Sequence, residues 1–386
     1  MAKISGARGA AFRNHRAAAK KVSSSDALGP SRQISACDFP LRPLQVTWEI
    51  TQSCHWKGAP ARVSAARTRD KQELSTAEAF HLIDEIAALH VPLLAVTGGD
   101  PLARGDLLPI LQYASRHSVR TSLTLLPTAL LTRDAISDLK DCGLMRAAFW
   151  LHGSTAALHD PRAVPGAYHR TLEAVGWCHE VGLPVQVNTT MVRRTLPDLN
   201  FAIELLSRLD VVLWNVFFFV PPSRDHAGEL LTAEEHEEVF AKLYAASGRV
   251  HFQIKTTEGQ HYQRFLLQKR ARESRGRMTE AESITCAPRG VNDGKALVFI
   301  NHAGEVYPSR FLPLSGGNIK AEPLSRIYCD SPLFVSLRDS SQLKGKCGRC
   351  PVHNVCGGSR ARAYGMTGDV FAEEPCCAYQ PEVAVA

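Results

Sequence analysis

The sequence predicts an α/β fold, a partial (β/α)6 TIM-like barrel over residues 41–265 followed by a small cysteine-rich domain over 266–386. Strand-like and helix-like segments alternate six times before residue 265. The strands are nearly continuous apolar runs, as in a parallel sheet covered on its outer face. Five of the eleven cysteines fall in the last 40 residues. Right-handed crossovers close such a sheet into a barrel, although a doubly wound open sheet has the same periodicity.

Each element follows from a local signal in the sequence. Capping boxes at Ser75/Glu78 and Thr232/Glu235 predict the starts of two helices. A charged stretch without an apolar stripe at 268–285 predicts a linker, and 296–308 predicts a hairpin that turns at 302–304. Strands are expected over 44–50, 93–97, 120–126, 146–151, 185–191 and 211–220, and helices over 75–89, 107–117, 133–142, 168–181, 197–209 and 232–247.

Charge and hydropathy narrow the class of protein. Residues 1–35 carry seven Lys or Arg and one acid, so the chain's net charge of +7 lies almost wholly there. We expect residues 1–40 to be a disordered basic tail, with a nucleic-acid arm or a targeting peptide as alternatives. The nearly neutral remainder argues against a nucleic-acid-binding body. No apolar run reaches the ~18 residues of a membrane span, and no secretory signal is visible. We therefore expect no membrane contact and a cytoplasmic location.

The cysteine-rich end predicts a metal centre. Cys347 and Cys350 form a C-x2-C turn, Cys356 follows after five residues, and Cys376 and Cys377 follow about twenty residues later. Gly348 and the pair Gly357–Gly358 let the backbone approach the sulfurs and donate N–H groups, while Lys344, Lys346 and Arg349 offset negative charge. Four thiolates suit a [4Fe–4S] cluster or a tetrahedral zinc ion, and the spacing does not decide between them.

Several motifs resemble the radical SAM enzymes and their C-terminal SPASM domain. Gly304-Glu-Val-Tyr-Pro-Ser309 and the cysteine pattern resemble SPASM, and this resemblance favours Cys377 over Cys376 as the fourth ligand. Thr97-Gly-Gly-Asp-Pro-Leu102 resembles the family's Gly-Gly-Glu-Pro motif, which contacts the amino group of S-adenosylmethionine. The resemblance, which covers roughly 42–382, implies an auxiliary [4Fe–4S] cluster and an S-adenosylmethionine site. The implied cofactor-binding residues are Gly98, Gly99, Asp100, Pro101 and, at the end of the fifth strand, Asn188, and the implied core cluster ligand is Cys54.

Two departures from the family pattern bear on activity. The family's C-x3-C-x2-C motif is replaced here by Cys54, Gly58 and Ala61, and neither glycine nor alanine has a side chain that binds iron. The spacing does not support Cys37, His55 or His90 as substitutes. The fourth strand has Trp150 and His152 where the family usually has Ser and Asp. The positions resembling the ligands of a first auxiliary cluster hold Cys286, Ser309 and Ser359, so we expect that cluster to be absent.

Other polar residues are candidates for a substrate site. Lys255, Glu258, His261 and Arg264 follow one strand and predict either a substrate-facing cluster or a solvated loop. The segment 160–166, with Asp160, Arg162 and Gly166, is expected at the barrel mouth, and Asn292-Asp293-Gly294 is expected to be a turn.

Three functional hypotheses remain. The preferred one is a degenerate homologue that retains one auxiliary [4Fe–4S] cluster and a vestigial S-adenosylmethionine site, and acts as a binding or regulatory protein. The alternative is an active radical SAM oxidoreductase, with an electron donor, that modifies a peptide, a peptide-derived cofactor or another small molecule. The last is a zinc-stabilised α/β protein of unrelated function. The residues leave the substrate open.

Overall fold

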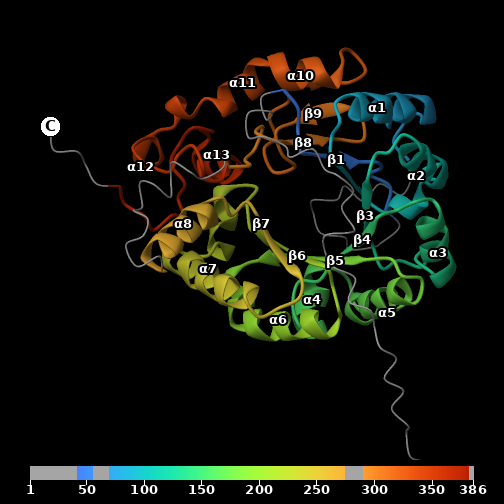
Figure 1. The fold of residues 1–386 in the computed structure, drawn as a ribbon, viewed down its shortest axis with the longest axis horizontal. Coiled ribbons are helices and arrows are strands. Elements are labelled where there is room, and N and C mark those ends of the chain that lie inside the picture. The colour runs from blue at the N-terminus through green and yellow to red at the C-terminus, as the bar shows by residue number, and fades with distance from the viewer. Residues whose placement is uncertain (1–40, 55–68, 274–289, 382–386) are drawn as a thin grey trace, which may run out of the picture. The chain divides into compact units, whose positions relative to one another are not determined.

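A single ten-stranded sheet organises the chain. The computed structural model describes residues 41–54, 69–273 and 290–381, and the basic tail and residues 274–285 of the predicted linker lie outside these ranges. Residues 268–273 of that linker are helical instead, because the helix that begins at His261 continues to Glu273. The strand order is β10-β9-β8-β1-β2-β3-β4-β5-β6-β7. Every pair from β8 through β1 to β7 is parallel, whereas β9 and β10 are antiparallel. Helices lie along the outer side of the curved row of strands (Figure 1). The predicted α/β partial barrel is confirmed.

The elements have the following bounds. The strands are β1 (Gln45–Glu49), β2 (Leu93–Thr97), β3 (Thr121–Leu125), β4 (Arg146–Trp150), β5 (Val185–Met191), β6 (Leu213–Phe218), β7 (Gln253–Thr257), β8 (Leu297–Ile300), β9 (Glu305–Tyr307) and β10 (Gly317–Asn318). The helices are α1 (Thr76–Ala88), α2 (Leu107–Arg116), α3 (Arg133–Asp141), α4 (Ala156–His159), α5 (Ala167–Glu180), α6 (Leu199–Arg208), α7 (Ala233–Ser247), α8 (His261–Glu273), α10 (Leu324–Asp330), α11 (Pro332–Arg338), α12 (Gly345–Gly348) and α13 (Arg360–Thr367).

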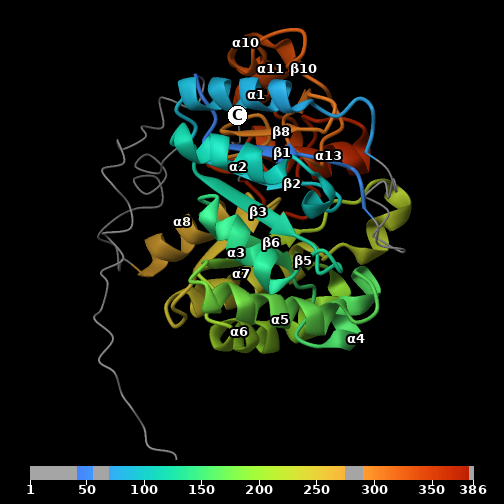
Figure 2. The ribbon, with the colours of Figure 1, turned by 90° about the vertical axis from the view of Figure 1, so that its right-hand side faces the viewer.

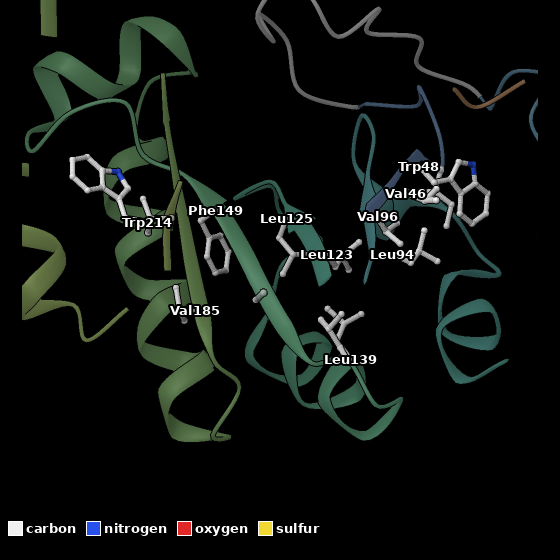
Figure 3. Packing of buried hydrophobic residues seen from close by; sticks show 14 of the residues in the cluster. Val46, Trp48, Leu94, Val96, Leu123, Leu125, Leu139, Phe149, Val185 and Trp214 are labelled. Carbon is white, nitrogen blue, oxygen red and sulfur yellow. The ribbon is translucent and has the colours of Figure 1, made fainter. Parts of the chain in front are cut away.

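The barrel strands have two chemically different faces. Side chains such as Val46, Trp48, Leu94, Val96 and Phe149 are buried between strands and outer helices (Figure 3). The residues that alternate with them are small or polar and face inward, where they line a cavity; they include Thr47, Ala95, Ser122, Ala148, Gln186 and Asn188. Because successive side chains of a strand point to opposite faces, the same strands build both the core and the cavity wall.

Local signals place the helices as the sequence predicts. Ser75 and Thr232 both form complete capping boxes, with Glu78 and Glu235, at the starts of α1 and α7. Figure 2 shows α1 and α2 beside β1 and β2, and α5 and α6 beside β5. Since each helix returns the chain to the opposite end of the sheet, the carboxyl ends of β1 to β7 meet at one rim, where ligands bind in such folds.

The sheet extends beyond the six β-α units that the sequence indicates. Strand β7 and helix α8 form a seventh unit, and α8 continues to Glu273 across the expected division at residue 265. Strand β8 pairs with β1, and the predicted hairpin joins it to β9. Helix α10 packs against α1, where the Leu324 N–H donates to Glu85 Oε2 over 2.6 Å. No helix in the described ranges is long and apolar enough to cross a bilayer.

Candidate functional site

The barrel encloses a cavity of about 300 Å³, within the usual range for ligand pockets. Paired residues of four neighbouring strands form one layer of its wall: Trp150 on β4, Asn188 on β5, Asn215 on β6 and Lys255 on β7. The Lys255 Nζ donates to Gln45 Oε1 on β1 over 3.2 Å. This bond joins β7 to β1, two strands that do not pair with each other in the sheet.

One side of this barrel cavity is aromatic. The ring of Trp150 lies 4.9 Å from that of Phe217, and Phe217 lies 6.2 Å from Phe311, measured between ring centroids. Trp150 also stacks on His152 at 5.4 Å. These rings offer a broad apolar surface that suits a flat ligand.

Positive side chains also line the barrel cavity. Burial, followed by the nearby Arg146, lowers the pKa of Lys255 from 10.5 to about 8. Burial lowers the pKa of Arg310. Arg162 lies 2.7 Å from Glu229 and places its guanidinium 5.8 Å from the centroid of the Phe219 ring. The sequence pointed to Arg162 and Lys255, but not to Arg310, which reaches the cavity only because β8 and β9 join the barrel.

The predicted cofactor loop follows β2. A Cβ atom at Gly98 would lie 2.5 Å from the Thr51 carbonyl oxygen, and one at Gly99 would lie 2.3 Å from that of Ser53. The Gly99 and Asp100 N–H groups donate to these same two oxygens. In this structure the two glycines therefore let the chain pass close to the segment that leads to Cys54.

Only some of the predicted cofactor-binding residues line the barrel cavity. Gly98 and Asn188 line it. Asp100 is fully buried, where its Oδ2 accepts from Thr128 Oγ1 over 2.7 Å and its Oδ1 accepts from the Leu102 N–H. Pro101 opens the 3-10 turn that follows. The assignment of these residues and Gly99 to S-adenosylmethionine stays a prediction.

The core cluster position has one described cysteine. Cys54 is buried at the rim reached by β1, while Gly58, Ala61, Cys37 and His55 lie outside the described residues. His90 follows the end of α1, where its Nδ1 lies 2.8 Å from the Ala88 carbonyl oxygen. Since α1 returns the chain to the amino end of β2, His90 lies at the opposite rim from Cys54. It is not a substitute ligand in this fold.

Four cysteines of the C-terminal segment line a second, smaller cavity of about 20 Å³. They are Cys347, Cys350, Cys356 and Cys377, the four that the sequence predicts. Cys376 lies elsewhere, buried with Val192, Phe219 and Leu230 in an apolar cluster. Adjacent residues point apart here, so the structure supports the choice of Cys377.

Each sulfur of this cysteine cavity accepts a backbone N–H. Glu374 donates to Cys347 Sγ over 3.3 Å, and Gly358 donates to Cys356 Sγ over 3.4 Å. Val352 and Tyr379 donate to Cys350 and Cys377. Three of the four donors lie two residues after the cysteine that they serve. Gly358 adopts a left-handed backbone (φ 65°), at which its N–H reaches the sulfur.

Burial raises the pKa of all four thiols, that of Cys350 to about 11. No described group of three or more His, Cys, Asp or Glu side chains converges as a metal-ion site requires. The four cysteine sulfurs that line this cavity are a donor set suited to a [4Fe–4S] cluster or to a tetrahedral zinc ion. The N–H donors and the charges of Arg264 and Lys346 suit the negative sulfurs of such a cluster.

The expected substrate-facing cluster after β7 is divided between the two cavities. Lys255 and Glu258 line the barrel cavity, whereas His261 and Arg264 line the cysteine cavity. His261 is fully buried, and neither ring nitrogen has a hydrogen-bond partner. Sequence position alone could not show this division. It arises because the strand residues face the barrel cavity, whereas the first residues of α8 face the cysteine cavity.

A buried polar network joins the two cavities. Ser359 Oγ donates to Glu258 Oε2 over 2.5 Å, and the Ser359 N–H donates to Glu374 Oε2 over 2.7 Å. Arg362 Nη1 pairs with the same Glu374 oxygen at 2.9 Å. Glu258 and Ser309 line the barrel cavity, whereas Glu374 lines the cysteine cavity. No sequence motif points to Glu374, which is separated from Arg362 by eleven residues.

Glu258 and Asp293 form a coupled carboxyl pair in this network. Burial and then the charge of Asp293 raise the pKa of Glu258, and burial raises that of Asp293. Asp293 Oδ2 accepts from the Ala361 N–H, and Asp293 also bonds with Ser309. We take Glu258 to be protonated and to donate to Asp293. The predicted serines Ser309 and Ser359 thus hold a carboxyl pair, and Cys286 lies outside the described residues.

Comparisons with known proteins agree with this architecture. Residues 37–206 match the Radical SAM superfamily. Together with a relative that is 34% identical over 340 residues, covering 88% of this chain and 97% of the relative, this match shows that the chain belongs to the radical SAM superfamily, with a SPASM-type C-terminal segment. Members of this family bind [4Fe–4S] clusters and S-adenosylmethionine.

Two of the relatives are named as tetrapyrrole synthases, and one structural neighbour is bound to a peptide. The relative at 34% identity is the AdoMet-dependent heme synthase of Methanosarcina barkeri. The Fe-coproporphyrin III synthase of the same organism is 25% identical over 347 residues, covering 86% of this chain and 87% of the relative. Streptococcus suis SuiB bound to precursor peptide SuiA has the same fold, with a TM-score of 0.65 at 12% identity, covering 88% of this chain and 76% of SuiB.

Proposed function

We propose that this chain binds an anionic iron tetrapyrrole in the barrel cavity and holds one [4Fe–4S] cluster in the cysteine cavity. The observation that carries the tetrapyrrole assignment is the cavity lining, which combines the aromatic wall of Trp150, Phe217 and Phe311 with the cations Lys255, Arg162 and Arg310. A porphyrin is a flat aromatic ring with carboxylates at its edge, so it matches both features. The names of the two tetrapyrrole relatives point to the same ligand class.

The cluster assignment rests on the four lining cysteines and their four backbone donors. A bound [4Fe–4S] cluster supplies one-electron transfer. The chain's own residues would hold it from one side by the 347–358 segment and from the other by Cys377, while Arg264 and Lys346 offset its charge.

We further propose that this chain is a degenerate homologue without radical chemistry. The reason is the sequence at the core motif, where Gly58 and Ala61 replace two of the three thiols, and one thiolate is too few to retain a cubane cluster. The second candidate, an active radical SAM enzyme, is favoured by one specific observation, the near-complete match to a relative named AdoMet-dependent heme synthase.

Three measurements test these proposals. After anaerobic reconstitution, iron and sulfide analysis should give about four irons per chain, whereas two clusters would give about eight and zinc would give none. Titration with Fe-coproporphyrin III should shift its visible absorbance and saturate at one equivalent. Absence of binding would contradict the tetrapyrrole proposal. Steady release of 5′-deoxyadenosine by reduced protein would show that the second candidate is correct.

A further inference from the structure

Two histidines line one part of the barrel cavity wall. His152 follows β4 and His159 ends α4, and both side chains line the cavity. Their rings stack with centroids 5.6 Å apart and planes 20° apart. Both residues are buried, and His159 is only 1% exposed. They extend the aromatic wall, since Trp150 also stacks on His152.

Backbone donors fix which nitrogen of His159 carries the proton. The His152 backbone N–H donates to His159 Nδ1 over 3.0 Å. An imidazole nitrogen that accepts a hydrogen bond has no proton, so in the neutral ring the proton is on Nε2. The His159 ring is neutral at pH 7, because burial lowers its pKa from 6.5 to about 4. His159 Nε2 is buried and has no partner, so its N–H is a donor without an acceptor.

His152 is the same tautomer as His159, with its proton on Nε2. The Thr190 N–H lies 3.5 Å from His152 Nδ1, a long contact that again places a donor at Nδ1. Burial, the neighbouring His159 and then Arg162 lower the pKa of His152. Both rings therefore offer N–H groups rather than lone pairs, which excludes their use as metal ligands while the backbone donors stay in place.

The unsatisfied buried N–H of His159 indicates a missing acceptor. A buried N–H without a partner destabilises the fold, and a carboxylate oxygen in the cavity would give it an acceptor. Arg162, which is paired with Glu229 at 2.7 Å, lines the same cavity, and its positive charge acts on His152. Imidazole N–H donors and a guanidinium that line one cavity are groups that recognise a carboxylate.

We propose that His152, His159 and Arg162 form a carboxylate subsite that grips an edge carboxylate of the bound tetrapyrrole. This inference rests on the proposed function and names the part of the cavity that orients the ligand. The carboxylate of S-adenosylmethionine has the same chemistry, so the test must separate the two sources.

The test compares Fe-coproporphyrin III with its methyl ester, in which no carboxylate is free. Binding of both is measured by absorbance titration to the full chain and to His159→Phe, His159→Gln and Arg162→Gln. His169→Ala is the matched control, because His169 is an exposed histidine on the nearby helix α5. Each variant is checked for an unchanged melting temperature, and Arg162→Gln keeps the inference testable if His159→Phe does not fold.

We expect His159→Phe and Arg162→Gln to weaken binding of the free acid about tenfold or more. They should leave ester binding unchanged. His159→Gln, which retains an N–H donor, should recover part of the loss, and His169→Ala should bind as the natural chain does. Equal losses for acid and ester, or no loss for either, would overturn the subsite and leave the proposed function standing.

Two other outcomes have distinct meanings. If neither porphyrin binds to the natural chain, the tetrapyrrole proposal itself fails. S-adenosylmethionine is titrated into the same proteins by calorimetry. If His159→Phe weakens its binding and leaves porphyrin binding intact, the carboxylate is that of S-adenosylmethionine and the tetrapyrrole subsite is wrong.

Discussion

The rim of the barrel at Cys54 and the cysteine cavity differ in how many sulfurs they bring together. In the cysteine cavity four thiols line one space, and each receives a backbone N–H. At the rim, one buried thiol is described, and the family's other two ligand positions hold Gly58 and Ala61. The surrounding fold is retained at both places. The two places thus share a retained fold and differ in the number of thiols that they offer a metal centre.

The largest expected effect is at the cysteine cavity. Replacing Cys347 by alanine removes one of four ligands, so we expect reconstituted iron to fall from about four atoms per chain towards background. The melting temperature should fall with it, because metal binding contributes to folding. Cys376→Ala is the matched control and should keep its iron, since Cys376 lies in a separate apolar cluster. Loss of iron in the control alone would reverse the ligand assignment.

The converse experiment restores the missing ligands at the rim. The double change Gly58→Cys with Ala61→Cys recreates the C-x3-C-x2-C spacing with Cys54. We expect iron to rise from about four to about eight atoms per chain, with 5′-deoxyadenosine released under reduction. Gly58→Ser with Ala61→Ser controls for bulk and polarity. Natural protein that already holds about eight irons would contradict the degenerate reading.

The buried network between the two cavities contains two carboxyl groups, Glu374 and Glu258. Removing the cation beside Glu374 and removing the acid at Glu258 should change the folding stability by different amounts. Arg362→Met leaves Glu374 buried without its cation, and we expect unfolding to become easier by about 3–5 kcal/mol. Glu258→Gln should cost less than about 1 kcal/mol, because a protonated Glu258 already behaves as a neutral donor and acceptor. Chemical denaturation measures both.

The raised pKa of Glu258 sets the direction in which its contribution to folding stability changes with pH. Its pKa in the folded chain is raised above the ordinary 4.5, so folding favours the protonated acid. That stability is present below pH 4.5 and decreases as the pH rises towards the folded pKa. The stability of Glu258→Gln relative to the natural chain should therefore increase from pH 4.5 to 7. A constant difference would show that Glu258 is not a buried acid.

The smallest expected effect is on ligand affinity in the barrel cavity. Lys255 is charged below its pKa of about 8, so we expect porphyrin binding to weaken a few-fold as the pH rises from 7 to 9. Lys255→Arg, which stays charged over this range, should bind with little pH dependence. Absorbance titrations at each pH measure both, and parallel curves for the two proteins would exclude Lys255 from ligand binding.

The sequence predicted what depends on local pattern. Capping pairs such as Ser75 with Glu78 defined helix starts, and strand periodicity defined the barrel. It could not show that β8 pairs with β1, which brings Arg310 into the barrel cavity, because that pairing joins segments about 250 residues apart. Nor could it assign His261 and Arg264 to the cysteine cavity, since the direction of α8 depends on tertiary packing. The choice between Cys376 and Cys377 needed the resemblance, because both are cysteines at adjacent positions.

The network from Glu258 through Ser359 to Glu374 has a consequence for charge balance. Glu374 lies beside the cysteine sulfurs and donates its own N–H to one of them. If the cysteine cavity holds a cluster, an electron that the cluster accepts would raise the negative potential along the network and so favour a proton on the carboxyl pair at the barrel wall. Reduction at one end and proton uptake at the other would then be thermodynamically linked.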